Sequence, residues 1–142
     1  EHDALLTVDS IGTAFGGGGF NAVLRDQARF GEMMRNGGRA HGKQLVPSEV
    51  IADITRGGDR EAFKVGGAPT IPGGSYRNMW WVMHNKHGAY SARGIHGQAI
   101  YIDPTAEMVI ARFASHPLAG NFNFDPTSLP AYQAIAERLL QG

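Results

Sequence analysis

The segment from residue 94 to residue 113 constrains the fold most, because its pattern is typical of two adjacent strands. Residues 98–102 and 108–114 are rich in β-branched, aromatic and other apolar side chains, which favour strands. Between them, residues 103–107 read Asp-Pro-Thr-Ala-Glu and contain turn-forming side chains. The segment therefore predicts a strand, a tight turn and a second strand, with a glycine-bracketed histidine at the entrance.

A further strand is expected upstream of this hairpin. Residues 76–84 are aromatic-rich and are bounded by turn-forming residues. Asn-Lys-His-Gly at residues 85–88 predicts a hairpin turn, after which residues 89–92 continue towards the next strand. Three successive antiparallel strands are the simplest arrangement of these segments.

The remaining apolar patterns predict helices. Apolar residues recur at helical spacing over residues 22–36, 47–56 and 129–141. Asn21 is expected to cap the first helix, and glycine pairs end the first two. Residues 1–19 are expected to be irregular, and residues 58–75 to form a long loop rich in glycine and proline. The sequence therefore predicts an α+β fold, an antiparallel three-stranded meander flanked by helices.

Composition excludes several classes of function. The 142 residues carry 13 basic and 13 acidic side chains, a net charge of zero, and show no basic run. No nucleic acid is therefore expected as a partner. No membrane partner is expected either, since no apolar run approaches the roughly 18 residues of a membrane span. The absence of cysteine excludes disulfides, thiolate metal sites and a cysteine nucleophile, and leaves the cellular compartment open.

Four short motifs, in this order and spacing, carry a resemblance to a known family. They are the glycine run at 16–19 that leads into a helix, Tyr-Arg-Asn-Met-Trp-Trp at 76–81, Gly-Ile-His-Gly-Gln at 94–98 and Ser-His-Pro at 115–117. Over nearly all its length the chain resembles the C-terminal part of the β-lactamase-related, penicillin-recognising serine hydrolases. Within that superfamily it looks most similar to the 6-aminohexanoate-dimer hydrolases and the class C β-lactamase-like esterases.

This resemblance implies a fold, a chemistry and a partner. Residues 1–142 would be the C-terminal portion of a β-lactamase/transpeptidase-like fold, whose open sheet edge is covered by strands from the N-terminal half. The family hydrolyses small-molecule amides or esters through an acyl-enzyme, without a metal or an organic cofactor. The chain begins Glu-His-Asp, without methionine, which we interpret as a boundary inside a longer protein. The N-terminal half would be supplied in cis or as a separate chain.

The resemblance also implies a backbone group with a catalytic role. If Gly94 matches the glycine of the family motif, the N–H of Ile95 is one of two donors in the oxyanion hole. An ordinary sheet N–H is the alternative. The motif usually opens with Lys-Thr-Gly, whereas Ala-Arg-Gly stands here at 92–94, so the lysine is missing. This departure argues against a true β-lactamase.

Other residues are expected near the substrate. The resemblance places at the pocket edge or rim Gly16, Gly17, Gly94, His96, Gly97, Ser115, His116 and Asn121. His96 suits either hydrogen bonding and proton transfer or simple packing in a turn. Arg93 suits either a carboxylate ligand or a solvated charge at a strand end. The glycine run lacks a Gly-Lys-Ser/Thr ending, so it does not predict a phosphate loop.

Two further groups of side chains are interpreted as structural. Tyr76, Tyr90 and Tyr101 are assigned to packing, because the family's catalytic tyrosine is expected in the other half. His84 and His87 have a His-x-x-His spacing but no third ligand, so no metal site is predicted.

A nucleophile is the element that the sequence lacks. No serine is followed three residues later by lysine, the arrangement in which the lysine can act as the base for serine. Gly-x-Ser-x-Gly is also absent. The chain is therefore expected to be inactive alone and to supply the oxyanion strand and pocket rim of a serine hydrolase. Two alternatives stay open, a non-catalytic binding or structural domain and a self-contained enzyme that uses His96 with an unrecognised serine.

Overall fold

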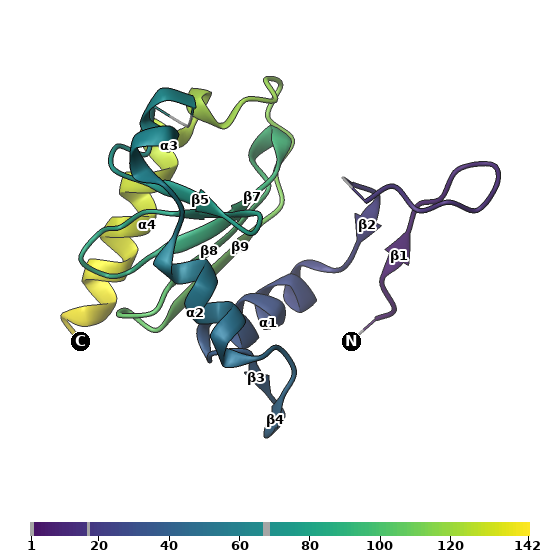
Figure 1. Ribbon diagram of the computed structural model, residues 1–142, viewed down its shortest axis with the longest axis horizontal. Helices are drawn as coiled ribbons and strands as arrows, with labels where there is room; N and C mark the ends of the chain where they lie inside the picture. Colours follow the sequence, from purple (N-terminus) through teal and green to yellow (C-terminus); the bar gives the residue numbers. More distant parts are fainter. Residues whose placement is uncertain (1, 17, 67–68) are drawn as a thin grey trace.

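A five-stranded antiparallel sheet forms the centre of the computed structural model, which describes residues 2–16, 18–66 and 69–142. Its strands lie in the order β5 (Ser75–Arg77), β6 (Trp80–Val82), β7 (Tyr90–Arg93), β8 (Ala99–Asp103) and β9 (Met108–Arg112). Each strand pairs with the next one along the chain, so the sheet is a simple meander (Figure 1). The predicted α+β class and antiparallel meander are confirmed.

The predicted number of three strands is wrong, because residues 76–84 form two strands and β7 is a strand of its own. Asn78 and Met79 have φ values of 48° and 69° and close a tight turn in which Arg77 pairs with Trp80. Turns with two left-handed residues match the twist of hairpins and usually contain glycine. Since neither residue here is glycine, the usual sequence signal for this turn is missing.

The three predicted helices are present with shifted ends. They are α1 (Leu24–Arg35), α2 (Ser48–Arg56) and α4 (Asp125–Leu140). Asn21 does not cap α1, since the helix begins after Val23 and the Asn21 side chain donates to the carbonyl of Gly19 at 2.9 Å. The last helix begins at Asp125 rather than Leu129, with Pro126 in its first turn, where a missing N–H costs no hydrogen bond.

An additional helix, α3 (Arg60–Gly66), lies within the segment predicted to be a loop. The carboxylate of Asp59 accepts hydrogen bonds from the backbone N–H groups of Glu61 and Ala62, at 2.9 and 3.0 Å. These N–H groups have no partner inside the helix, so an aspartate at this position favours a helix start.

The helices cover the two faces of the sheet with separate apolar clusters. On one face α1 and α2 pack on the sheet through Met33, Met34, Ile51, Ile54, Trp80, Val82, Tyr90 and Ile102. On the other face α4 packs through Ala89, Tyr101, Ala106, Met108, Tyr132 and Ala136. Trp80 and Trp81 point to opposite faces, as expected for neighbours on a strand, and Trp80 is the buried one.

The N-terminal segment forms an arm that projects from the rest of the molecule (Figure 1). Within it β1 (Leu5–Leu6) pairs with β2 (Phe20–Asn21), so the prediction of an irregular lead-in is only partly correct. A second small hairpin, β3 (Arg39–Ala40) and β4 (Lys43–Gln44), follows α1. In the part of the chain that the structure describes, no helix is long and apolar enough to cross a membrane.

Candidate functional site

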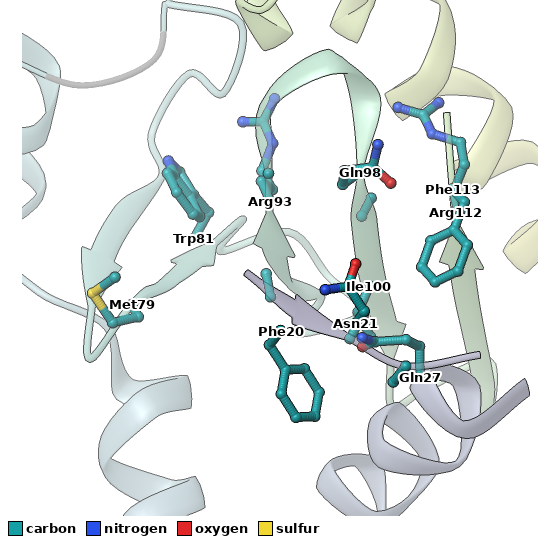
Figure 2. Close-up of a pocket in the computed structure, with 14 residues that line it drawn as sticks. Phe20, Asn21, Gln27, Met79, Trp81, Arg93, Gln98, Ile100, Arg112 and Phe113 are labelled. Carbon is teal, nitrogen blue, oxygen red and sulfur yellow. The ribbon is translucent and has the colours of Figure 1, made fainter. Parts of the chain in front are cut away.

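A cavity of about 680 Å³ lies at the end of the sheet where β7 gives way to β8. Its lining includes Trp81, Arg93, Gln98 and Arg112 from the sheet side and Phe20 and Gln27 from β2 and α1 (Figure 2). Gly94 also lines the cavity. The sheet end and the arm therefore line an open groove beside the turn at residues 94–98.

That turn is a short 3₁₀ segment, Ile95–Gly97, rather than the start of a strand. It is closed by hydrogen bonds from the Gly94 N–H to the Gln98 carbonyl (2.9 Å) and from the Gln98 N–H to the Ile95 carbonyl (3.3 Å). Ile95 is 65% exposed, and among the described residues its own N–H has no hydrogen-bond partner. This N–H is thus not an ordinary sheet donor, and it belongs to the peptide that Gly94 contributes to the cavity wall.

His96 joins the turn to the loop that follows β9. Its Nδ1 lies 2.7 Å from the carbonyl oxygen of His116, and its N–H donates to the Ala119 carbonyl at 3.1 Å. The His116 N–H donates back to the His96 carbonyl at 3.1 Å. A carbonyl can only accept, so Nδ1 of His96 carries the proton of the first bond.

The ring of His116 packs on both sides. It stacks on Phe124 with ring centroids 4.4 Å apart. A Cβ on Gly97 would lie 2.5 Å from its Cδ2, and Gly97 has a φ of 91°, so only glycine suits this position. His116, expected at the pocket rim, is therefore a packing residue that holds the turn.

Two further side chains also hold the turn, that of Arg112 in β9 and that of Gln98, which follows the 3₁₀ segment. The Nε of Arg112 donates to the Gly97 carbonyl at 2.7 Å and its Nη1 donates to Ser128 Oγ at 2.8 Å. The Gln98 amide donates to the Ala114 carbonyl and accepts from the Ala114 N–H. Sequence reasoning included Gln98 only as the last residue of a motif and missed Arg112, for which a charged side chain inside an apolar strand was the available signal.

Arg93 is neither solvated nor free to bind an external carboxylate with its whole guanidinium group. It forms a buried ion pair with Asp125 at the start of α4, with side chains only 6% and 5% exposed. Its guanidinium also lies 5.7 Å from the centre of the Trp81 ring, and Thr70 donates to the same carboxylate. The expectation of a solvated strand-end charge is wrong, because the partner lies 32 residues away in the sequence.

The other expected rim residues are spread out. Ser115 is exposed beside His116, and Asn121 lies in the 3₁₀ segment Asn121–Asn123 next to the turn. Gly16 is exposed on the arm and does not line the cavity, although Phe20 of the same arm does. Gly17 lies outside the described residues. The structure thus brings Gly94, Ile95, His96, Gly97 and His116 together and leaves Gly16 apart.

Comparison with known proteins shows that the chain is similar to part of one group of hydrolases. No family model matches the sequence. The chain is 40% identical over 118 residues to a 6-aminohexanoate-dimer hydrolase of Paenarthrobacter ureafaciens, a match that covers 82% of this chain and 30% of the relative. A solved structure from Bacillus anthracis, assigned as a 6-aminohexanoate-dimer hydrolase, superposes on 96% of this chain with a TM-score of 0.81 and 34% identity.

The chain is homologous to part of a 6-aminohexanoate-dimer hydrolase. The resemblance found in the sequence is thereby confirmed. The chain spans 30% of the curated relative and 34% of the solved one, about a third of their length.

Homology to a hydrolase raises the question of whether a serine in this chain has a histidine beside it. Ser75 Oγ lies 2.7 Å from His84 Nε2 and accepts a hydrogen bond from the Gly58 N–H at 3.1 Å. Ser75 is fully buried, so no substrate carbonyl reaches it. The pair links the end of α2 to β5, and burial, followed by the charge of Arg60, lowers the pKa of His84.

The remaining candidate acid–base side chains serve the fold. Burial raises the pKa of Tyr90 to about 12, and burial, aided by the charge of Asp103, raises that of Tyr101 to about 12. The buried His87 ring lies with its Nδ1 2.7 Å from a carboxylate oxygen of Asp103. In the described part of the chain no three His, Cys, Asp or Glu side chains gather where they could hold a metal ion.

Proposed function

We propose that this chain is the C-terminal part of a serine hydrolase domain and supplies its oxyanion-binding turn. The complete protein hydrolyses small-molecule amides or esters through an acyl-enzyme. The observation that carries the proposal is the Ile95 N–H, which has no partner among the described residues and sits on a turn held from several sides beside a cavity. Homology to 6-aminohexanoate-dimer hydrolases supports the reaction class.

The chemical role of the turn follows from charge development in acyl transfer. When a nucleophile attacks a carbonyl carbon, the carbonyl oxygen becomes an oxyanion, and fixed N–H donors stabilise it. A donor of this kind contributes about 3 kcal/mol to the transition state in other hydrolases. The Ile95 N–H suits this role, because it belongs to an exposed residue of the turn and no described residue accepts a hydrogen bond from it. The second donor is the N–H of the nucleophilic residue.

The nucleophile itself we assign to the N-terminal half of the hydrolase, in cis or as a separate chain. This chain has no Ser-x-x-Lys, and its one close serine–histidine pair among the described residues is buried. The outer edge of β9, which no described strand pairs, is where we expect strands of that half to add to the sheet. The reaction needs no metal or organic cofactor.

The residues that we propose to contact the substrate lie in the glycine-containing turn and in the loop after β9. Gly94 lines the cavity without a side chain and allows a substrate to approach the turn backbone, whereas at Gly97 the equivalent space is filled by the His116 ring. Ser115 lies in the loop after β9 and Asn121 in the 3₁₀ segment next to the turn, and their hydrogen-bonding groups suit an amide or ester.

Complementation tests the proposal. The segment of the Paenarthrobacter relative that this chain does not match is purified separately and mixed with this chain, and turnover of amide and ester substrates is measured. We expect turnover only in the mixture. Turnover by this chain alone would show that its nucleophile lies within it. A stable complex without turnover would favour the alternative, a binding or structural domain that keeps the fold.

A further inference from the structure

The backbone of His96 is in an uncommon conformation for its residue type. It has a φ of 56° and a ψ of 19°, in the left-handed region, and Gly97 after it has a φ of 91°. Residues other than glycine rarely adopt this region, and do so where the surrounding structure holds them. Such residues cluster at functional sites, where the contacts around them hold the backbone in place.

Three hydrogen bonds hold His96, and all of them connect it to residues 116–119. The Nδ1–H, the backbone N–H and the backbone carbonyl of His96 are each engaged with this loop. The loop in turn is fixed by the stacking of the His116 ring on Phe124, immediately before α4. His96 therefore attaches the turn to the loop that leads into the last helix of the molecule.

The same residue is next to the candidate oxyanion donor. His96 follows Ile95 directly, so its backbone dihedrals and those of Ile95 set the direction of the peptide that carries the Ile95 N–H. That N–H has no partner among the described residues, so nothing else on the peptide holds it by hydrogen bonding. The backbone bonds between Gly94, Ile95 and Gln98 close the turn, and the attachment of His96 to the loop fixes the direction of the peptide relative to the rest of the fold.

We infer that His96 is a positioning residue whose Nδ1–H bond to the His116 carbonyl fixes the Ile95 N–H in the direction required for an oxyanion. Its effect on catalysis rests on the function proposed above, whereas its effect on the Ile95 peptide does not. In this role the ring of His96 keeps its Nδ1 proton and does not pass that proton to substrate.

Three substitutions separate the hydrogen bond from the backbone conformation. His96→Asn keeps both, because asparagine adopts the left-handed region readily and its Nδ2 replaces the Nδ1 donor. His96→Gly keeps the conformation and removes the donor. His96→Ala removes the donor and also disfavours the conformation. His41 is an exposed histidine with a φ of 49° in the β3–β4 turn, so His41→Gly is the matched control.

The first readout is the order parameter of the Ile95 N–H by ¹⁵N relaxation on the 142-residue chain. We expect a rigid value near about 0.85 in the parent chain, His96→Asn and His41→Gly, and a fall towards about 0.6 in His96→Gly. The ¹⁵N shifts of the His96 ring report whether Nδ1 carries the proton. An unchanged Ile95 order parameter in His96→Gly, or an unprotonated Nδ1, would overturn the inference. His96→Gly remains informative if His96→Ala fails to fold.

The second readout is turnover after complementation with the remainder of the relative. We expect His96→Gly to lower kcat by about 10- to 100-fold with little change in KM, and His96→Asn to restore most of it. Equal kcat values for His96→Gly and the parent chain would contradict a positioning role. If the parent mixture shows no turnover, the proposed function fails, and the relaxation measurement alone decides the inference about His96.

Discussion

At the scale of the residue, the proposed function of this chain depends on one backbone N–H group, that of Ile95. Ile95 has an exposed side chain with no evident chemistry, and its importance lies in the peptide before it. A search for reactive side chains does not find such a group. The resemblance of Gly-Ile-His-Gly to a family motif indicated it, and the lack of a partner for its N–H among the described residues supports it.

Replacing Ile95 with proline removes this N–H at low structural cost. Gly94 has φ −108° and ψ 170°, a conformation that a following proline allows, and the lost N–H bonds to no described group. In the complemented hydrolase we expect Ile95→Pro to lower kcat by about 10²- to 10³-fold. Ile95→Ala keeps the N–H and should lose far less. Similar losses in the two variants would mean that the side chain, not the N–H, matters.

The residues that hold the turn could not be assigned this role from the sequence. His96 and His116 were expected near the substrate, but their hydrogen bonds run to each other across 20 residues. Arg112 stands in no motif and Gln98 only at the end of one. Their roles could not be predicted, because their partners, the backbone carbonyls of Gly97 and Ala114, come near only in the folded sheet. Local pattern identified the turn, and tertiary structure determines what fixes it.

At the scale of the element, β7 and α4 are joined by the buried pair of Arg93 and Asp125. Asp125→Asn removes one charge and leaves the other buried without a countercharge, which costs about 3–5 kcal/mol in comparable sites. We expect a corresponding fall in the free energy of unfolding, measured by urea denaturation. Glu61→Gln, which breaks an exposed pair with Lys64, should change it by less than about 0.5 kcal/mol. A small effect of Asp125→Asn would show that the pair does not connect these elements.

A second ion pair, between α2 and the β5–β6 hairpin, makes stability depend on pH. Hydrogen bonds from Arg77 and then Asn78 lower the pKa of Asp53 to about 2 from its ordinary 3.8. The folded state therefore holds this carboxylate ionised where the unfolded chain takes up a proton. The stabilisation is present above about pH 4 and is lost as the pH falls towards 2. In thermal melts, Asp53→Asn should lower Tm more at pH 6 than at pH 2.5, and an equal shift at both would contradict this assignment.

The helices and strands with long apolar patterns could be predicted from the sequence, whereas those that depend on a short local arrangement could not. The long apolar stripes of α1, α2 and α4 predicted helices correctly. The β5–β6 turn was missed because Asn78 and Met79 adopt left-handed conformations without glycine. α3 was missed because its cap, Asp59, stands in a segment dominated by glycine and proline. Both errors fall where a local backbone arrangement overrides the pattern around it.

At the scale of the whole molecule, the chain presents a surface suited to further contacts. Apolar side chains of the arm are exposed, among them Leu5, Ile11, Phe15 and Phe20, and so is Phe113 beside the cavity. Exposed apolar surface of this kind is typical of protein interfaces. The chain is also only about a third as long as the homologous hydrolases. Both observations support the proposal that this chain forms one part of a larger active site.

Intact-mass spectrometry after a fluorophosphonate serine probe shows directly which polypeptide carries the nucleophile. The probe is applied to this chain alone and to its mixture with the unmatched segment of the Paenarthrobacter relative. We expect the relative's polypeptide to gain the mass of one probe and the 15.3 kDa chain to stay unlabelled in both samples. A probe adduct on this chain would contradict the central claim, because the nucleophile would then lie within its 142 residues.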